Sequence, residues 1–310
     1  MNLQSLIDQF ITYRQSLGDQ FLPNCTVKAF GRFVGSDIGM SDVTDEQVNR
    51  FLRGSGPITL TWHIKLSGLR TFYQYATSRG YVARAPLPTV VPKRPPPFVP
   101  YVYSHEELRS LLQAAKEFDR PSSMEPGALH LILLVLYATG LRVREVVNLN
   151  REDVNVSDCL ITVLRSKFGK TRLVPFTSQL QPALLDYEQR HSAYGNSAPF
   201  FLTRCGGRVK TDTLQHNYRI LCDRIGIRRH DRARYQPRIH DLRHTFAVHR
   251  VTSWYQQGAN VQALLPLLSI YLGHVHIRAT QVYLSTTPEL LDEAGKRFER
   301  YAMNEVRHDR

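Results

Sequence analysis

The sequence predicts a mainly α-helical protein of two domains, with a small three-stranded antiparallel sheet in the second domain. Apolar residues recur at helical spacing through most of the chain. A proline-dense stretch separates two helical regions, and short β-rich runs occur only within the second region. The length of 310 residues fits two domains of about 100 to 200 residues each.

The N-terminal region, residues 1–83, is predicted to be an all-helical domain. Helical patterns cover residues 25–34, 44–52 behind a Thr or Asp cap, and 60–78. An earlier helix is predicted from apolar residues that follow the i, i+3, i+4, i+7 spacing of one buried face, namely Leu3, Leu6, Ile7, Phe10, Ile11 and Leu17.

The stretch RAPLPTVVPKRPPPFVPY from Arg84 contains too many prolines for a helix or a central strand. We predict an extended, semi-rigid linker over residues 84–103. The second domain, residues 104–310, is predicted to begin with a helix at SHEELRSLLQAA. Ser104 as N-cap and Glu107 three residues later form a capping box, which satisfies backbone amides at the helix start.

The second domain is predicted to be mostly helical with a small sheet. An apolar helix runs from about Gly127 to Gly140, and GLRVREVVNL resumes helical spacing. Two β-rich runs around a glycine-containing turn in CLITVLRSKFGKTRLVPF predict a hairpin, and APFFLT is a third short run. Helical patterns dominate from Gly207 to the end of the chain.

The net charge is strongly positive, with 40 Lys and Arg against 27 Asp and Glu, a formal +13. Residues 1–100 carry +5 and the remainder +8, so the excess is spread over both domains. Such a charge attracts polyanions, and its spread suits two domains that grip one nucleic acid. Solubility alone is the alternative.

Neither disulfides nor a membrane span are expected. The four cysteines, Cys25, Cys159, Cys205 and Cys222, form no CxxC pair and no metal-ligand spacing. The longest apolar run, LILLVLYATGL, is shorter than the ~20 residues that cross a bilayer, and no N-terminal signal pattern occurs. We therefore expect a cytoplasmic protein with no membrane partner.

Two arginines are paired in sequence with groups that suit acid–base or phosphate chemistry. His240 and Arg243 are three residues apart in IHDLRHTFAVHR and would project from one helix face. Arg142 follows a glycine at a helix start, with Glu145 three residues later to hold its guanidinium. Surface helices and ordinary ion pairs are the alternative interpretations.

Further candidates follow along the chain. Lys167 lies in the turn RSKFGKTR, with Lys170 and Arg172 as competitors for the same role, and a solvated turn lysine is the alternative. His274 and Tyr283 are nine residues apart, on segments that can fold back to one cleft. A partly buried tyrosine is the alternative there.

Through ATGLRVREVVNL, SKFGKTRLVPF, HDLRHTFA, YLGH and TQVYL, the sequence resembles the tyrosine recombinase family, which comprises phage-integrase and Xer-type enzymes. The resemblance covers essentially the whole chain, because residues 1–83 also resemble the family's core-binding (SAM-like) domain, although with weaker motifs. It implies that residues 104–310 form a catalytic domain that ends in an exchange helix.

The resemblance implies that Arg142 and Arg243 clamp the scissile phosphate and that Tyr283 is the nucleophile, forming a 3′-phosphotyrosyl link. Arginine suits this role because its planar fork of donors neutralises charge on the nonbridging oxygens in the transition state. A free tyrosine has a pKa of ~10, so its attack needs a base, and His240 is the candidate.

The remaining catalytic positions are also implied by the resemblance. Lys167 would protonate the departing 5′-oxygen, and His274 would hydrogen-bond the phosphate. Glu145 would support the Arg142 side of the pocket without taking part in the chemistry. No metal or other cofactor is expected, since the sequence offers no carboxylate cluster suited to Mg²⁺.

Double-stranded DNA is the expected partner. Candidate phosphate contacts beside the active site, for which a solvated loop is the alternative, are Arg228, Arg229, Arg232, Arg234 and Arg238. Further candidates are Lys65 and Arg70 in the N-terminal domain, and Lys170 and Arg172 at the hairpin.

A homo-oligomer is also expected, as a dimer on one site and a tetramer in the synapse, with a partner recombinase as a further possibility. An amphipathic helix is predicted from Thr287 and Pro288 through Leu290, Leu291, Ala294 and Phe298. In this family such a helix docks on a neighbouring protomer.

The predicted function is site-specific cleavage and rejoining of DNA strands, in integration, excision or transposition of a mobile element. The segment between Arg243 and His274 is about two helical turns longer than in the Xer pattern. This longer segment resembles that of recombinases carried on transposons or plasmids. A type IB topoisomerase and a noncatalytic DNA-binding protein on the same fold are the alternatives.

Overall fold

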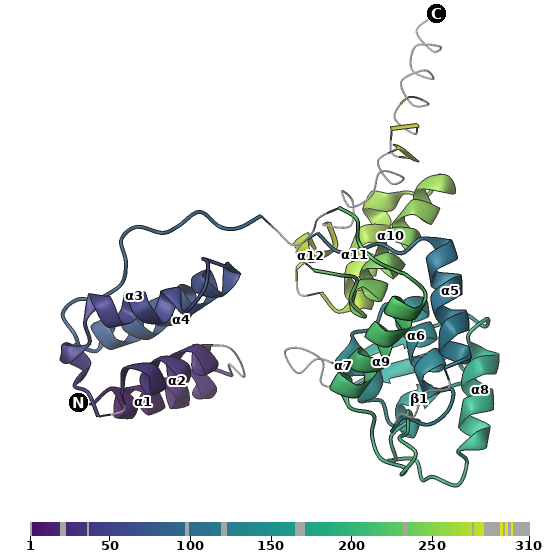
Figure 1. Cartoon of the computed structure of the whole chain (residues 1–310), viewed down its shortest axis with the longest axis horizontal. Helices are drawn as coiled ribbons and strands as arrows, with labels where there is room; N and C mark the ends of the chain where they lie inside the picture. The colour runs from purple at the N-terminus through teal and green to yellow at the C-terminus, as the bar shows by residue number, and fades with distance from the viewer. Residues whose placement is uncertain are drawn as a thin grey trace, which may run out of the picture. The chain divides into compact units, whose positions relative to one another are not determined.

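The computed structural model in Figure 1 divides the chain into two compact units, Met1–Phe98 and Val99–Arg310. It describes residues 2–18, 23–35, 37–96, 99–118, 123–164, 171–231, 235–274, 276–281, 292–293, 295–296 and 299. No helix among these residues has both the length and the apolar character that a bilayer span requires.

The first unit is a four-helix domain, as the sequence predicts (Figure 1). Thr44 caps the third helix in a capping box with Gln47. The core is aromatic, with Phe10, Phe30 and Phe72 fully buried. The elements are α1 Leu3–Ser16, α2 Pro23–Val34, the 3₁₀ turn η1 Met40–Asp42, α3 Asp45–Arg53 and α4 Leu60–Ser78.

The second unit is built around one apolar helix, α6, which packs against both α5 and α10. Its N-terminal helix has the predicted capping box between Ser104 and Glu107. The helices of this unit are α5 His105–Lys116, α6 Ala128–Thr139, α7 Val143–Val147, α8 Gln181–Arg190, α9 Thr211–Arg224, α10 Asp241–Gln256, α11 Val261–Leu272 and α12 Arg278–Gln281, with the 3₁₀ turn η2 Arg151–Asp153.

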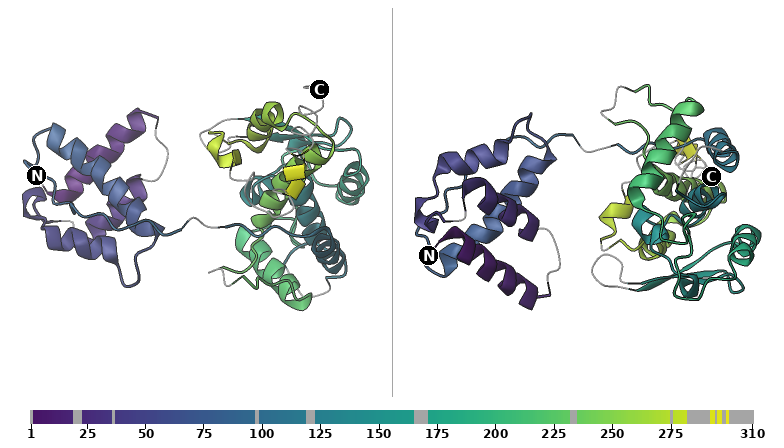
Figure 2. Two further views of the ribbon diagram at one scale, coloured as in Figure 1. Left: turned by 90° about the horizontal axis from the view of Figure 1, so that it is seen from above. Right: turned by 60° about the horizontal axis from the view of Figure 1, so that its bottom comes forward.

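The sheet of the second unit has three antiparallel strands in the order β1-β2-β3 and lies at the edge of the unit (Figure 2). Strands β2, Leu160–Val163, and β3, Arg172–Pro175, form the predicted hairpin, with Ile161 opposite Val174. The third strand is β1, Val154–Asn155, which pairs with β2.

The third β run expected at APFFLT is not part of this sheet. It makes only isolated bridges, Asn150 with Pro199, Met124 with Thr203, and Leu202 with Arg208. Phe200, Phe201 and Leu202 are all buried, so this segment lacks the alternation of a strand with one exposed face. It packs as an extended core segment, and the two-residue β1 takes the sheet position instead.

The boundary between the units falls inside the predicted linker, residues 84–103. Ala85 and Leu87 pack against the first core, whereas Tyr101 and Tyr103 belong to the second. The Tyr103 N–H donates to Thr245 Oγ1 at 3.1 Å, which fixes the end of the linker to α10. The helix expected from Thr287 to Phe298 lies largely outside the described residues.

Candidate active site

The turn after α6 positions the first arginine of the site. The helix ends at Gly140, whose φ of 62° is left-handed and therefore favours glycine. A Cβ on Gly140 would lie 2.4 Å from the Phe246 ring, so a side chain at this position would clash with α10. Two residues later the chain enters α7 with Arg142 as its N-cap.

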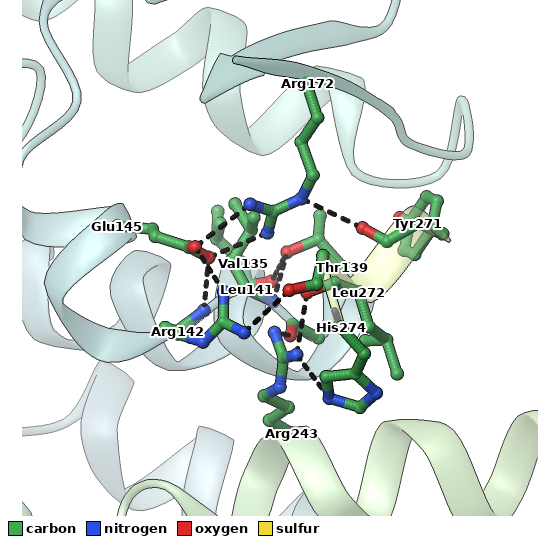
Figure 3. Close-up of polar contacts among 12 residues, drawn as sticks. Val135, Thr139, Leu141, Arg142, Glu145, Arg172, Arg243, Tyr271, Leu272 and His274 are labelled. Atoms are coloured by element: carbon green, nitrogen blue, oxygen red, sulfur yellow. Dashed lines mark hydrogen bonds and ion pairs between the residues drawn. The ribbon is translucent and has the colours of Figure 1, made fainter. Parts of the chain in front are cut away.

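Glu145 holds two arginines at once, and Figure 3 shows them on opposite sides of its carboxylate. The Arg142 Nη1 donates to Oε1 at 2.7 Å, and the Arg142 backbone N–H donates to Oε2 at 2.9 Å. Arg172, from β3, donates to both carboxylate oxygens at 3.0 and 2.8 Å. The expected support of Arg142 by Glu145 is thus present, together with a second cation.

The two arginines also bind the end of α11 and the turn that follows it. Arg142 Nη2 donates to the Gly273 carbonyl at 2.9 Å, and Arg172 Nε donates to the Tyr271 carbonyl at 3.0 Å. Burial alone would raise the pKa of Glu145, but the hydrogen bonds from Arg172 and Arg142 lower it to about 2. The carboxylate is therefore charged at every working pH.

Arg243 and His274 form the other half of the cluster (Figure 3). Arg243 is only 2% exposed, and it donates to the carbonyls of Gly140 at 2.8 Å and Leu272 at 2.7 Å. Its Nη2 also lies 2.9 Å from Nε2 of His274. Since arginine only donates, Nε2 is the acceptor, and the His274 proton is on Nδ1.

The protonated nitrogen of His274 links the site to α12. Nδ1 lies 2.8 Å from Oγ1 of Thr280, which is fully buried. Helix α12 ends at Gln281, two residues before Tyr283. His274 thus anchors the segment that leads to the predicted nucleophile, while Tyr283 itself lies outside the described residues, as does Lys167.

His240 directly precedes α10 and lies beside the arginines, with its ring 5.3 Å from that of His244 in an edge-to-face arrangement. Burial and then Arg243 lower the pKa of His240 to about 4. Burial and His240 lower that of His244 to about 3, and burial and Arg243 lower that of His274 to about 4. All three rings are neutral at pH 7, and a neutral His240 can accept a proton.

These three histidines should make the protein labile to acid. Their pKa values in the folded state lie below the ~6.5 of an unfolded histidine. Below pH 6.5 the unfolded chain therefore binds more protons, and stability falls as pH drops toward about 4. We expect the melting temperature to decrease steeply from pH 6.5 to 4.5, and less steeply when inorganic phosphate is added.

Scanning calorimetry across this pH range checks the acid lability. The variant His240→Gln should show a shallower decrease, because it has one buried imidazole fewer. The control His216→Gln alters an exposed position on α9 and should keep the wild-type profile. A melting temperature that is flat between pH 6.5 and 4.5 would contradict the prediction.

The candidate DNA contacts of the second unit have varied surroundings. Arg228 is exposed and lies 3.5 Å from Asp223, and Arg238 lies 3.3 Å from Asp241. Arg229 is tied within the protein, donating to the Val99 carbonyl at 2.7 Å and to Asp231. Arg172 belongs to the Glu145 cluster. Three candidates, Arg232, Arg234 and Lys170, lie outside the described residues.

In the first unit, Arg70 is exposed on α4. Lys65 donates to the Phe51 carbonyl at 2.6 Å and lies over the Phe51 ring at 4.4 Å. These contacts give Lys65 a structural role in joining α3 to α4, and its contact with DNA stays a prediction.

Several members of the site gave no clear signal in the sequence. Arg172 stood out only as one of several cations at the hairpin, and its partners are supplied by α7 and α11. Thr280 is a single buried hydroxyl without any pattern around it. His244 follows Arg243 directly and is four residues after His240. This helical spacing could have predicted its presence in the site.

The arrangement suits the binding of an anion whose negative charge increases during a reaction. Three guanidinium groups meet at residues 271–274, where Arg243 also contacts His274, and Glu145 joins the other two guanidinium groups. This leaves a net positive site walled by buried helices, in which electrostatic interactions are stronger than in water. Within the described part of the chain, no group of three His, Cys, Asp or Glu residues is placed to hold a metal ion.

Comparison with known proteins assigns this site to a family. The phage integrase family matches residues 102–289. The putative integrase/recombinase y4rB of Sinorhizobium fredii is 35% identical over 246 residues, which are 77% of this chain and 78% of the relative. The tyrosine recombinase XerC of Oceanobacillus iheyensis is 31% identical over 237 residues, 74% and 71% of the two chains.

Solved structures share the fold. The Tn1549 transposon integrase in complex with transposon right end DNA superposes with a TM-score of 0.68 at 17% identity, over 97% of this chain and 100% of that one. A λ integrase dimer bound to a COC′ core site gives 0.62 at 17% identity, over 91% and 77%. The mostly helical chain thus has an integrase fold. It belongs to the phage integrase family, the tyrosine-type site-specific recombinases.

Proposed function

We propose that this recombinase cleaves and rejoins DNA through a 3′-phosphotyrosyl intermediate formed by Tyr283. The observation that carries the proposal is the convergence of Arg142 and Arg243 on the turn that leads into His274, which places two guanidinium groups for a phosphate. Because the proposed substrate is DNA, we also propose a cytoplasmic location.

In the proposed step, Tyr283 Oη attacks the scissile phosphorus as His240 accepts the phenolic proton. A new P–O bond forms to the tyrosine, and the bond to the 5′-oxygen breaks. Lys167 gives a proton to that oxygen, which leaves as a free 5′-hydroxyl. One phosphodiester is exchanged for another, so the reverse attack by a 5′-hydroxyl reseals a strand without an energy source.

A mobile element is the proposed substrate. The Tn1549 transposon integrase, whose structure is solved in complex with transposon right end DNA, has the same fold over nearly the whole chain. Helices α10 and α11 contain the long spacing between Arg243 and His274, which resembles that of transposon- or plasmid-borne recombinases. Integration, excision and transposition all use this same strand exchange.

The proposal is tested with two substrates. Nicked duplexes that carry candidate element ends trap the covalent complex, because the short fragment beyond the nick diffuses away. A denaturation-resistant protein–DNA band on these duplexes is expected, with no relaxation of a supercoiled plasmid that lacks the site. Relaxation of any plasmid would favour a type IB topoisomerase. Tight, salt-sensitive binding without a covalent band would favour a noncatalytic DNA-binding protein.

Duplex DNA and further copies of the chain are the proposed partners, with a partner recombinase as an additional possibility. The relatives include a λ integrase tetramer bound to a Holliday junction. A cavity of about 400 Å³ beside α11 would receive the predicted amphipathic segment 287–298 of a neighbouring copy. The cavity is lined by Ala138, Pro175, Phe176, Thr177, Phe246, Arg250, Trp254, Leu264, Leu267, Leu268 and Tyr271.

The substitution Leu267→Asp should weaken this docking. Leu267 lines the cavity yet is 59% exposed, so the change should leave the fold intact. Burying a leucine is worth about 1.5 to 3 kcal/mol, and we expect cooperative binding of a second copy to fall ~10- to 100-fold. Mobility-shift titration on DNA with two adjacent sites measures this cooperativity.

The matched control for Leu267 is Leu173→Asp. Leu173 is equally exposed, at 59%, but lies on β3 and does not line the cavity. It should retain cooperative binding. Equal losses in the two variants, or no loss in Leu267→Asp, would reject the proposed docking surface.

A further inference from the structure

Arg172 has a more specific environment than a DNA-contacting cation needs. Its side chain is 11% exposed and lies at the first position of β3. Its guanidinium donates to both oxygens of Glu145 and to the Tyr271 carbonyl (Figure 3). This is the geometry of a fixed structural cation, in which the fork of donors is matched to a carboxylate.

The neighbouring turn is shaped around this guanidinium. Gly273 has a φ of 68°, and a Cβ there would lie 2.9 to 3.1 Å from Nη1, Cζ and Nε of Arg172. Gly273 also offers its carbonyl to Arg142, and His274 follows it directly. Arg172 therefore contacts the turn that orders two of the predicted phosphate-binding groups.

The charges of the cluster give Arg172 a second effect. Glu145 accepts hydrogen bonds from both Arg142 and Arg172. With both arginines present, the group of three side chains carries a net charge of +1. Without Arg172, the carboxylate would cancel the charge of Arg142, the group that is predicted to face the phosphate. A phosphate would then meet a neutral ion pair in place of a cation.

We propose that Arg172 is a positioning residue for strand cleavage. It neutralises Glu145 so that Arg142 keeps its positive charge for the scissile phosphate, and it fixes the turn 271–274 that carries His274. It also ties the start of β3, just after the segment that contains Lys167, to the same cluster. This inference rests on the proposed function, because cleavage is the step that the arrangement would serve.

The test is a double-mutant cycle on the rate of covalent-complex formation at saturating nicked DNA. We expect Arg172→Gln to lower that rate by about 10- to 100-fold, the usual consequence of displacing a positioned group. The double variant Arg172→Gln with Glu145→Gln removes one positive and one negative charge. The group of three side chains then has a net charge of +1 again, carried by Arg142. The double variant should therefore cleave at least ~5-fold faster than Arg172→Gln, since the two residues are coupled.

Two further measurements separate positioning from the simpler roles. In Arg172→Gln the salt slope of DNA binding should fall by up to about 0.9, because the scissile phosphate meets a neutral ion pair. In the double variant the slope should return to the wild-type value, whereas loss of a direct phosphate contact by Arg172 would leave it reduced. Arg151→Gln is the control for losing a buried guanidinium, because Arg151 is 12% exposed and donates to the carbonyls of Glu188 and His191. It should cleave at the wild-type rate.

Each outcome bears on the inference. A double variant that is slower than Arg172→Gln would show that the two residues contribute independently, and would overturn it. A salt slope that stays reduced in the double variant would instead make Arg172 a DNA contact. If the wild-type protein itself forms no covalent complex on any end sequence, the proposed function is wrong. The double-mutant cycle then has no cleavage rate to compare.

Discussion

Replacing Tyr283 by phenylalanine is expected to abolish the covalent protein–DNA complex while leaving DNA binding within about twofold of wild type. The change removes one oxygen atom, and no other atom of the side chain can attack phosphorus. The charged groups proposed to bind the phosphate are untouched, since the arginine cluster is built from α7, β3, α10 and the turn after α11.

The nicked-duplex assay checks this prediction, with Tyr271→Phe as the matched control. Tyr271 is the nearest described tyrosine in sequence, but its hydroxyl donates to the Pro175 carbonyl at 2.9 Å. Burial raises its pKa to about 12, so it is poorly suited to act as a nucleophile. Tyr271→Phe should retain the band. A band that persists in Tyr283→Phe would assign the nucleophile to another residue.

Local sequence signals predicted the elements that carry the site. The cap at Thr44, the capping box at Ser104 and the glycine at the end of α6 mark helix termini by chemistry that acts over three or four residues. The hairpin followed from two β-rich runs around one turn. Each of these signals is complete within a short stretch, so tertiary structure did not override it.

The features that were missed depend on residues far apart in the chain. Strand β1 has two residues, too few to show any period, and APFFLT is drawn into the core by aromatic burial. Arg172 finds its partners 27 and 99 positions away, at Glu145 and Tyr271. No spacing rule within the hairpin distinguishes it from Lys167 or Lys170, so only the folded structure identifies Arg172 as the partner of Glu145.

The pKa values of the histidines are a further property that the sequence did not indicate. The motif HDLRH gives their spacing, but their low pKa values come from burial at the start of α10 and from the adjacent arginines. The same packing that keeps His240 neutral at pH 7 holds Arg243 against the carbonyls of Gly140 and Leu272. The proposed proton acceptance by His240 and the proposed phosphate binding by Arg243 therefore depend on one set of contacts.

Arg243→Lys is expected to reduce the rate of covalent-complex formation by about 10²- to 10³-fold, corresponding to the ~3 to 4 kcal/mol that a lost transition-state donor typically costs. Lysine keeps the charge, but its single ammonium cannot reproduce the planar fork. That fork donates to the Gly140 carbonyl, the Leu272 carbonyl and His274 Nε2 together. The loss should appear in the rate at saturating DNA more than in the affinity, because the missing donors act on charge that develops in the transition state.

Stability measurements distinguish this chemical effect from unfolding. Arg243→Lys leaves a buried carbonyl without its donor, which costs about 1 to 3 kcal/mol of unfolding free energy. Arg151→Lys should cost a similar amount, since Arg151 also donates from a mostly buried position to two backbone carbonyls. Only Arg243→Lys should slow cleavage, because Arg151 is bonded to α8, which contributes no residue to the arginine cluster. Equal slowing in both variants would mean that lost stability, and not phosphate binding, explains the effect of Arg243.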